Sequence, residues 1–212
     1  MSHIVVVDYG MGNLRSVAKA LEHVAPEHEI EVTGDPARLA RADRVVFPGQ
    51  GAMPDCMREI DARGLRPALI EAARSKPFLG LCIGLQLLFE RSEEGDTPGL
   101  GILAGEARRF QLEGVRDAHG ERLKVPHMGW NQVRPAGRHP LWAGLESGTR
   151  FYFVHSYYVV PVDAAVSAAS CSYHTEFCCA VAQDALFAVQ FHPEKSDRAG
   201  LQLLSNFVAW KP

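Results

Sequence analysis

The segment spanning residues 76–90 constrains the fold of this chain more strongly than any other. It begins with an apolar run behind a proline, typical of a buried strand, and ends in residues that favour a helix. The change falls at Gly80-x-Cys82-x-Gly84, a nucleophile-elbow pattern with cysteine in place of serine. A sharp strand-to-helix turn crowds the backbone, so small residues are needed on both sides of the nucleophile. The pattern predicts a Cys82 sulfur raised off the sheet edge at a helix N-terminus, where the helix dipole favours thiolate.

The same pattern also fits a buried, inert cysteine whose neighbouring glycines only make a turn. The periodicity of the preceding residues bears on that choice. Strand patterns at 3–8, 29–33 and 43–47 alternate with helix patterns at 14–24, 36–42 and 55–73, the last broken near Gly64 and Pro67. This alternation predicts a doubly wound parallel sheet, which binds ligands at the carboxyl ends of its strands. Cys82 falls at such an end, which favours a functional cysteine.

A glycine-rich loop, Pro48-Gly49-Gln50-Gly51, directly follows the strand pattern at 43–47. Glycines at this place allow backbone N–H groups to turn towards a ligand, as an oxyanion hole requires. An ordinary strand-to-helix turn would have a similar composition. Because this loop and Cys82 are expected at the same sheet edge, the functional interpretation is favoured here as well.

The pattern changes after residues 93–99 to short strand-like pieces separated by turn residues. These pieces lie around 106–110, 123–125, 132–134, 151–154, 166–172, 179–183 and 186–191, and a last helix is expected over 199–210. No flexible linker divides the halves. We therefore expect one domain over residues 1–212, an α/β fold whose mostly parallel, doubly wound sheet is flanked by helices and extended by an antiparallel strand section.

A candidate base follows the last strand pattern, at His192-Pro193-Glu194. Pro193 restricts His192 to an extended conformation, and side chains two positions apart then point the same way. Glu194 is therefore expected to hold one imidazole nitrogen, which leaves the other to deprotonate a thiol. A histidine at a strand end can also be structural, but together with the elbow the pattern predicts the catalytic set Cys82, His192 and Glu194.

Composition and charge argue against several classes of protein. The formal net charge of −3 gives no electrostatic footprint for nucleic acid or an anionic membrane. No apolar run approaches the ~18 residues of a membrane span, and residues 1–8 do not have the pattern of a signal peptide. The five cysteines form no regular framework, which indicates a reducing compartment. We expect a cytoplasmic protein without a nucleic-acid or membrane partner.

Two weaker motifs do not predict a cofactor or metal. Gly10-Met11-Gly12 lacks the third glycine of a dinucleotide fingerprint. Cys171, His174 and Cys178 resemble half of a zinc site, but no second Cys/His pair stands nearby. We expect no cofactor and no metal, with the pair Cys178-Cys179 packed in the core. Aromatic patches at 125–131 and 151–158 fit either a core or a partner surface.

The elbow at 80–86 and the motif at 190–194 resemble those of the class I (triad) glutamine amidotransferases. Within this class, the stretches 8–13, 126–131, 153–157 and 192–196 resemble the glutaminase subunits of imidazole glycerol phosphate synthases, enzymes of histidine biosynthesis. The similarity extends over nearly the whole chain.

The resemblance implies a mechanism. Cys82 attacks the side-chain amide of glutamine, His192 protonates the departing ammonia, and water hydrolyses the γ-glutamyl thioester. The ammonia passes to a separate (β/α)₈ barrel cyclase subunit, which makes imidazole glycerol phosphate and an aminoimidazole carboxamide ribotide. The resemblance also assigns an oxyanion loop, a glutamine site and a cyclase interface. For the oxyanion loop it implies Gly49 and Gly51. For the glutamine site it implies Gln86, Ser156 and Tyr157. For the cyclase interface it implies Asn13, Trp130 and Lys195.

One position departs from the family pattern, because Gln50 stands where a small apolar residue is expected between the two loop glycines. A thiolate facing glutamine without a partner would waste ammonia, which suggests gating. We expect the peptide at 49–51 to rest with its N–H turned away and to rotate when the loaded cyclase docks, since glycine makes such a rotation easy.

Other functions share parts of the pattern. The glutaminase subunit of anthranilate or aminodeoxychorismate synthase would have the same elbow and histidine motif, but Lys195 and the stretch 126–131 count against it. A non-catalytic binding module on the same fold would not need an intact set of Cys82, His192 and Glu194. A cysteine peptidase or esterase is a more distant alternative.

Overall fold

The computed structural model describes residues 2–116 and 120–212, and its centre is a parallel sheet. Five strands run parallel in the order β2-β1-β3-β4-β13. Their bounds are β1 (His3–Val7), β2 (Glu29–Thr33), β3 (Arg44–Phe47), β4 (Phe78–Leu81) and β13 (Leu186–Val189). Except for β2 they are almost wholly buried, as their β-branched and aromatic residues predict for strands covered on both faces.

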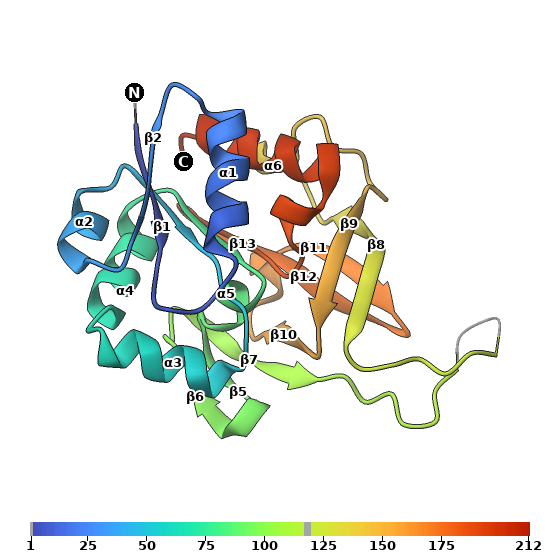
Figure 1. Ribbon diagram of the computed structural model, residues 1–212. Helices are drawn as coiled ribbons and strands as arrows, with labels where there is room; N and C mark the ends of the chain where they lie inside the picture. Colours follow the sequence, from blue (N-terminus) through green and yellow to red (C-terminus); the bar gives the residue numbers. More distant parts are fainter. Residues whose placement is uncertain (1, 117–119) are drawn as a thin grey trace.

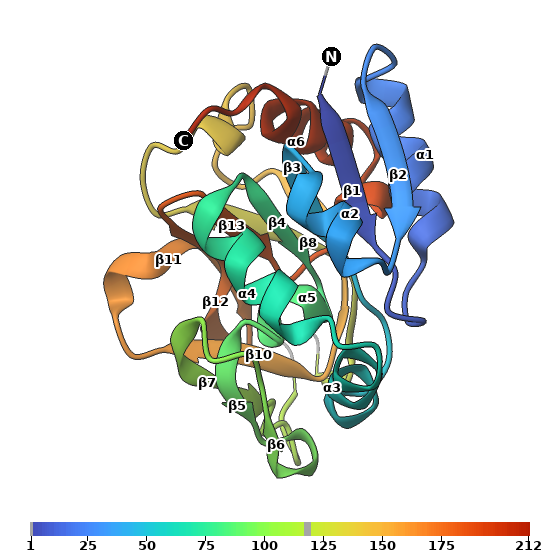
Figure 2. The same cartoon turned by 90° about the vertical axis from the view of Figure 1, so that its left-hand side faces the viewer.

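Helices cover both faces of this sheet (Figures 1 and 2). Their bounds are α1 (Leu14–Val24), α2 (Pro36–Arg41), α3 (Met53–Ala62), α4 (Arg66–Ser75) and α6 (Asp197–Ala209). Alternate residues of β1 enter different cores, since Ile4 and Val6 pack in the cluster that contains α1 and α6, whereas Val5 and Val7 pack with α2, α3 and α4. This arrangement confirms the doubly wound α/β fold.

The second half of the chain extends the sheet with mostly antiparallel strands. β12 pairs antiparallel with β13, and the sheet continues through β10, β7, β5 and β6, while β11, β8 and β9 branch from β12. The bounds are β5 (Phe89–Ser92), β6 (Thr97–Pro98), β7 (Leu103–Arg109), β8 (His127–Pro135), β9 (Arg150–His155), β10 (Tyr157–Pro161), β11 (Ser167–Tyr173) and β12 (Thr175–Gln183). The expected antiparallel section is therefore confirmed.

Short 3₁₀ turns connect these strands and lead into the last helix. They are η1 (Glu94–Asp96), η2 (Pro140–Trp142), η3 (Ala164–Val166) and η4 (Pro193–Lys195). None of the helices in the described residues is long and apolar enough to cross a membrane.

Four local expectations were wrong. The helix after the elbow, α5 (Ile83–Gln86), is one turn long, because the chain then pairs as β5 with β7. The strand expected at 123–125 is absent from the described residues, where Arg116 and Arg122 form only an isolated bridge. Strands β6 and β10 had not been expected. The last central strand ends at Val189 rather than Phe191, although His192 keeps an extended backbone (φ −104°, ψ 95°).

Candidate active site

The turn between β4 and α5 places Cys82 at the carboxyl edge of the central sheet. Cys82 has φ +55° and ψ −112°, a conformation that is strained for any residue with a side chain. Its N–H donates to Val189 O on β13 at 2.8 Å. A Cβ on Gly84 would stand 2.1 Å from Phe47 O, and one on Gly80 would stand 2.9 Å from the Ala188 Cβ. The two glycines are therefore required by close backbone packing, as the elbow pattern predicts.

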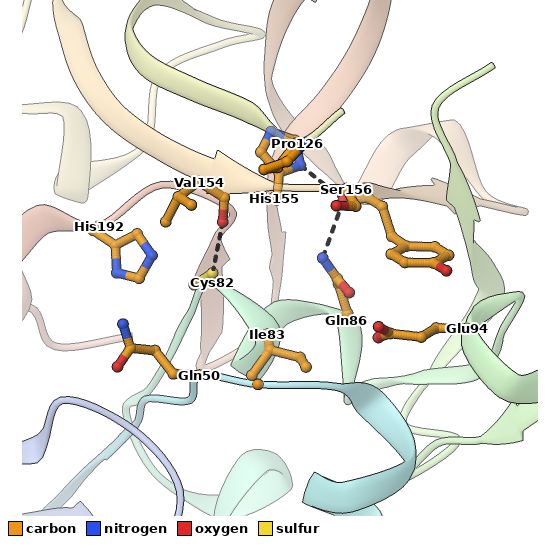
Figure 3. A pocket seen from close by; sticks show the side chains of 12 residues that line it. Gln50, Cys82, Ile83, Gln86, Glu94, Pro126, Val154, His155, Ser156 and His192 are labelled. Atoms are coloured by element: carbon orange, nitrogen blue, oxygen red, sulfur yellow. Dashed lines mark hydrogen bonds between the residues drawn. The ribbon is translucent and has the colours of Figure 1, made fainter. Parts of the chain in front are cut away.

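His192 lies beside Cys82 and is held by Glu194. The His192 Nδ1 and Glu194 Oε1 atoms are 2.8 Å apart, and the two side chains are only 3% and 2% exposed. The His192 Nε2 atom is buried without a hydrogen-bond partner among the described residues, and Figure 3 shows this side of the ring directed towards Cys82. The three side chains predicted as a catalytic set are therefore neighbours, with His192 between Cys82 and Glu194.

Opposing effects determine the charge of His192. Burial lowers the pKa of its imidazole, but the negative charges of the Cys82 thiolate and the Glu194 carboxylate outweigh it and raise the pKa to about 10. The raised pKa keeps the imidazole protonated at neutral pH beside the Cys82 sulfur. Because α5 has only four residues, the helix dipole at Cys82 is weaker than the sequence suggested.

Backbone and amide groups surround the sulfur on its other sides. The Cys82 Sγ lies 3.8 Å from Val154 O, and the Gln190 Nε2 donates towards it over 3.9 Å. The Gln190 side chain is fully buried, and its Oε1 accepts from Gln86 Nε2 at 3.0 Å. Gln190 belongs to the motif at 190–194, but nothing in its spacing predicted contact with the nucleophile.

A cavity of about 460 Å³ opens beside Cys82 (Figure 3). Its lining residues are Gln50, Gly51, Cys82, Ile83, Gln86, Glu94, Pro126, Val154, His155, Ser156, Tyr157 and His192. Of the predicted substrate residues, the structure brings Gly51, Gln86, Ser156 and Tyr157 to this wall. The Gln86 amide also donates to Tyr157 O at 3.1 Å, so both of its hydrogens are engaged. The group that Gln86 can offer to a ligand is therefore Oε1, an acceptor.

Gly49 lies beneath the wall rather than in it. A Cβ at this position would stand 2.1 Å from the Tyr9 Oη and 2.3 Å from the Ile83 Cγ2. At the other end of the loop, Gly51 adopts φ +109°. Between them the Gln50 carbonyl accepts from the Cys56 Sγ at 3.7 Å. The loop is thus packed tightly at its first glycine and has left-handed backbone freedom at its second.

Comparisons with known proteins agree with this geometry. The family model described as "Glutamine amidotransferase class-I" matches residues 5–210. The chain is 63% identical over 209 residues to "Imidazole glycerol phosphate synthase subunit HisH" of Dechloromonas aromatica (strain RCB), covering 99% of this chain and 97% of the relative. The HisH subunit of Aromatoleum aromaticum (strain DSM 19018 / LMG 30748 / EbN1) is 62% identical over 212 residues, with full coverage of both. This chain belongs to the HisH family of class I glutamine amidotransferases.

Solved structures show the same fold at low sequence identity. "Structure of PurLQS from Thermotoga maritima" superposes on this HisH-family chain with a TM-score of 0.72 and 19% identity, covering 99% of each chain. A structure described as "Crystal structure of glutamine amidotransferase" gives a TM-score of 0.70 and 18% identity, covering 96% of this chain and 98% of that one.

Sequence reasoning missed one charged residue of the HisH-family cavity. Glu94 lines the wall beside Tyr157, and its Oε2 accepts from the Met53 N–H at 2.8 Å. The acidic stretch at 93–96 predicts only a turn between the two halves. The position of Glu94 near Cys82 depends on the unexpected strand β5, so no local pattern in the sequence could have indicated it.

The three residues predicted at a partner interface lie outside this cavity. Trp130 on β8 is 44% exposed and packs edge-on against Tyr152, with ring centroids 6.2 Å apart. Asn13 is half-buried and caps α1 by accepting from Ser16 N at 3.4 Å, while Lys195 is half-buried in η4. Gly12 packs on the Gly49 backbone, so the loop that carries Asn13 adjoins the glycine-rich loop.

Among the residues described, three potential metal ligands cluster only at His3, Glu29 and Glu31, on β1 and the edge strand β2. The Glu31 carboxylate already receives Arg38 Nε at 2.9 Å and contacts His3 Nε2 at 2.7 Å. Cys178, which belongs to the pattern that resembles half of a zinc site, hydrogen-bonds with Ser167 and Ala180.

Proposed function

We propose that this HisH-family chain, acting as a single domain, hydrolyses glutamine at Cys82 and passes the ammonia to a (β/α)₈ barrel cyclase subunit in the cytoplasm. The observation that carries the proposal is the buried set of Cys82 and His192 at the wall of the cavity, with Glu194 holding the His192 ring. The HisH relatives favour this role over a subunit of anthranilate or aminodeoxychorismate synthase.

The first half-reaction forms a thioester. The Cys82 thiolate attacks the amide carbon of glutamine, and the electron pair of the C=O bond moves to oxygen. When the tetrahedral intermediate collapses, the C–N bond breaks and the imidazolium Nε2–H of His192 protonates the leaving nitrogen, which departs as ammonia. Glu194 holds Nδ1 and thereby keeps Nε2 directed at the reacting atoms.

The second half-reaction returns the enzyme to its starting state. The now neutral His192 takes a proton from water, whose oxygen attacks the γ-glutamyl thioester. The C–S bond breaks, glutamate leaves and the Cys82 thiolate is restored beside the imidazolium. The raised pKa of His192 matches this cycle, because it keeps on the imidazole the proton that the leaving nitrogen needs in the first step.

Two backbone segments are placed to bind the oxyanion. Ile83 is the first residue of α5, so its N–H has no acceptor within the helix. The second donor is the peptide N–H of the loop at 49–51. We propose that it rests turned away and rotates when the loaded cyclase docks, since the contact of the Gln50 carbonyl among residues 2–116 and 120–212 is the long one to Cys56.

The cavity wall fits the other end of glutamine. With the amide at Cys82, the α-ammonium group meets two acceptors, the Gln86 Oε1 and the Glu94 carboxylate, while Ser156 and Tyr157 complete the wall. Asn13, Trp130 and Lys195, which lie outside the cavity, are proposed to contact the cyclase.

The test is glutamate release from glutamine by the purified chain, alone and with a barrel cyclase subunit loaded with its ribotide ligand. We expect slow release alone, a strong increase in the loaded complex and none in Cys82→Ala. Equal release by the isolated chain and the loaded complex would overturn the gating. Release that persists in Cys82→Ala would overturn the assignment of the nucleophile.

A further inference from the structure

Two buried histidines that the proposed reaction does not use lie at the cavity wall (His155) and behind it (His127). His127 on β8 and His155 on β9 stand directly opposite each other in the antiparallel pair, and they are 3% and 6% exposed. The His127 ring is stacked between Tyr173 and Phe153, at centroid distances of 4.1 and 5.0 Å. Buried imidazoles need hydrogen-bond partners, and each of these two rings has the other as one partner.

The hydrogen bonds of these histidines form a chain that ends at the cavity. The His155 Nδ1 lies 2.7 Å from Tyr157 O, and its Nε2 lies 2.9 Å from the His127 Nδ1. The His127 Nε2 lies 3.2 Å from the Asn131 Nδ2, which also donates to Ser172 O at 2.8 Å. The chain therefore connects β8, the strand that carries exposed Trp130, with the cavity wall at Tyr157.

Only one placement of the imidazole hydrogens satisfies every hydrogen bond between Tyr157 O and Asn131. A carbonyl can only accept, so the His155 Nδ1 carries the hydrogen and its Nε2 is an acceptor for the Nδ1–H of His127. The His127 Nε2 is then an acceptor too, which matches the amide nitrogen of Asn131. The Asn131 orientation is fixed independently, because its Oδ1 accepts from Gln132 N at 2.8 Å.

A proton added to either ring would break this order, because an N–H would then face another donor. Burial acts in the same direction, since it lowers the pKa of His127 to about 4 and that of His155 to about 3. Both rings are thus held neutral, each as the tautomer with hydrogen on Nδ1.

The hydrogen-bond chain ends at the Tyr157 carbonyl, which is the group that orients Gln86. The Tyr157 carbonyl accepts from both His155 and the Gln86 Nε2, which Figure 3 marks with dashed lines. Since that amide also donates to Gln190, a carbonyl that turned away would release one Gln86 hydrogen and allow the amide to rotate. Rotation would direct a donor rather than Oε1 at the ligand.

We propose that His155 and His127 are positioning residues for glutamine, which fix the Tyr157 carbonyl and through it the acceptor face of the Gln86 amide. This inference rests on the proposed glutaminase function and adds to it two residues that do not touch the reacting atoms. Their effect is expected on the binding of glutamine rather than on the reactivity of Cys82.

The test measures two reactions of Cys82 in the complex with the loaded cyclase. Labelling by 6-diazo-5-oxo-L-norleucine requires the glutamine site, whereas alkylation by iodoacetamide requires only the thiolate. In His127→Phe, whose ring fits between Tyr173 and Phe153, we expect the half-saturating concentrations of glutamine and of the diazo probe to rise about tenfold (~1.4 kcal/mol). Alkylation of the Cys82 peptide should stay within about twofold of the wild type.

Conservative variants separate positioning from structural support. His155→Asn places an amide N–H where Nδ1–H stood and should recover most of the glutamine affinity, while His155→Gln places its amide at the Nε2 position and should not. His139→Phe is the matched control, since His139 packs on Phe187 and Trp210 away from the cavity.

Two results would overturn the proposal. One is unchanged affinity for glutamine in folded His127→Phe and His155→Gln. The other is a parallel loss of both labelling reactions and of melting temperature, which is the mark of a merely structural role. A wild-type protein without glutaminase activity would instead overturn the proposed function, so the two failures are distinguishable. NMR of the imidazole nitrogens should show hydrogen on Nδ1 of both rings, and hydrogen on Nε2 of either would contradict the chain.

Discussion

The Ser196 hydroxyl donates to the carbonyl oxygen of His192 at 2.6 Å and accepts from the Tyr152 N–H at 2.9 Å. The His192 N–H in turn donates to Tyr152 O at 2.9 Å. These three hydrogen bonds fasten the backbone of His192 to β9. Because Ser196 is 1% exposed, no water can replace its hydroxyl without a rearrangement of the backbone.

Ser196→Ala should therefore lower kcat for glutamate release about tenfold, because His192 loses a fixed distance to Cys82. The buried Tyr152 N–H left without a partner should cost about 1–3 kcal/mol of unfolding free energy, whereas the His192 carbonyl keeps the Lys195 N–H at 3.0 Å. Both quantities are measurable, by steady-state kinetics and by urea unfolding. Ser75→Ala is the matched control, since Ser75 donates to Glu71 O on the surface of α4. An unchanged kcat in Ser196→Ala would show that the fastening does not matter for catalysis.

Glu194→Gln should lower the pKa of His192, because it removes one of the two negative charges that raise it. The alkaline limb of the pH–rate profile for kcat/KM should then move to lower pH. We expect the rate at neutral pH to fall by at least about tenfold, since a neutral amide supports the imidazolium less well. Glu22→Gln, on the exposed face of α1, serves as a control. An alkaline limb at the same pH in Glu194→Gln as in the wild type would contradict the role of Glu194.

Glu94→Gln should raise KM for glutamine about tenfold and leave kcat nearly unchanged, because it removes an acceptor charge for the α-ammonium group. The amide keeps an oxygen that can accept from Met53 N, so α3 should remain capped. A glutamine analogue without the α-amino group should be hydrolysed equally by the wild type and the variant. Slower hydrolysis of that analogue by the variant than by the wild type would refute the pairing of Glu94 with the α-ammonium group. Glu93→Gln, at a neighbouring residue that does not line the cavity, is the control.

Stability should decrease as the pH falls from about 6.5 to 4, owing to His127 and His155. Their folded pKa values are about 4 and about 3, below the ~6.5 of an unfolded histidine, so the unfolded chain binds more protons in this window. Each ring contributes a slope of up to ~1.4 kcal/mol per pH unit. His192, whose raised pKa keeps it protonated in the folded state, opposes this slope only near pH 6.5, where the unfolded imidazole is half-protonated, and adds none at lower pH.

Urea unfolding at several pH values tests this linkage. The slope should be smaller by up to one proton in His127→Phe, whereas His23→Gln, at an exposed position on α1, should keep the wild-type slope. His139, whose pKa burial also lowers, contributes alike in each protein and cancels in the comparison. Identical slopes in the wild type and His127→Phe would show that His127 is protonated in the folded protein.

Local patterns in the sequence were sufficient for the elements of the parallel half. The β-branched run of β1 and the helical spacing of α1 reflect burial in the core, so their bounds could be predicted to within a residue. The elbow glycines were predictable for the same reason, since their need follows from local backbone crowding around Cys82.

The remaining differences arise from long-range pairing. Leu87 to Ser92 favour a helix locally, but Phe89 is fully buried and pairs with Leu103, which makes β5 a strand. That pairing also brings Glu94 to the cavity. Likewise, the contact between His127 and His155 depends on the register of β8 with β9, and no spacing within either strand shows that register.

The last strand in the sequence, β13, occupies the middle of the sheet between β4 and β12. Cys82 and His192 therefore become neighbours only after the final tenth or so of the chain has entered a sheet whose other strands were synthesised earlier. In a polypeptide that is still emerging from the ribosome, the turn that carries Cys82 can fold, but His192 is not yet beside it. Products truncated before β13 should consequently release no ammonia.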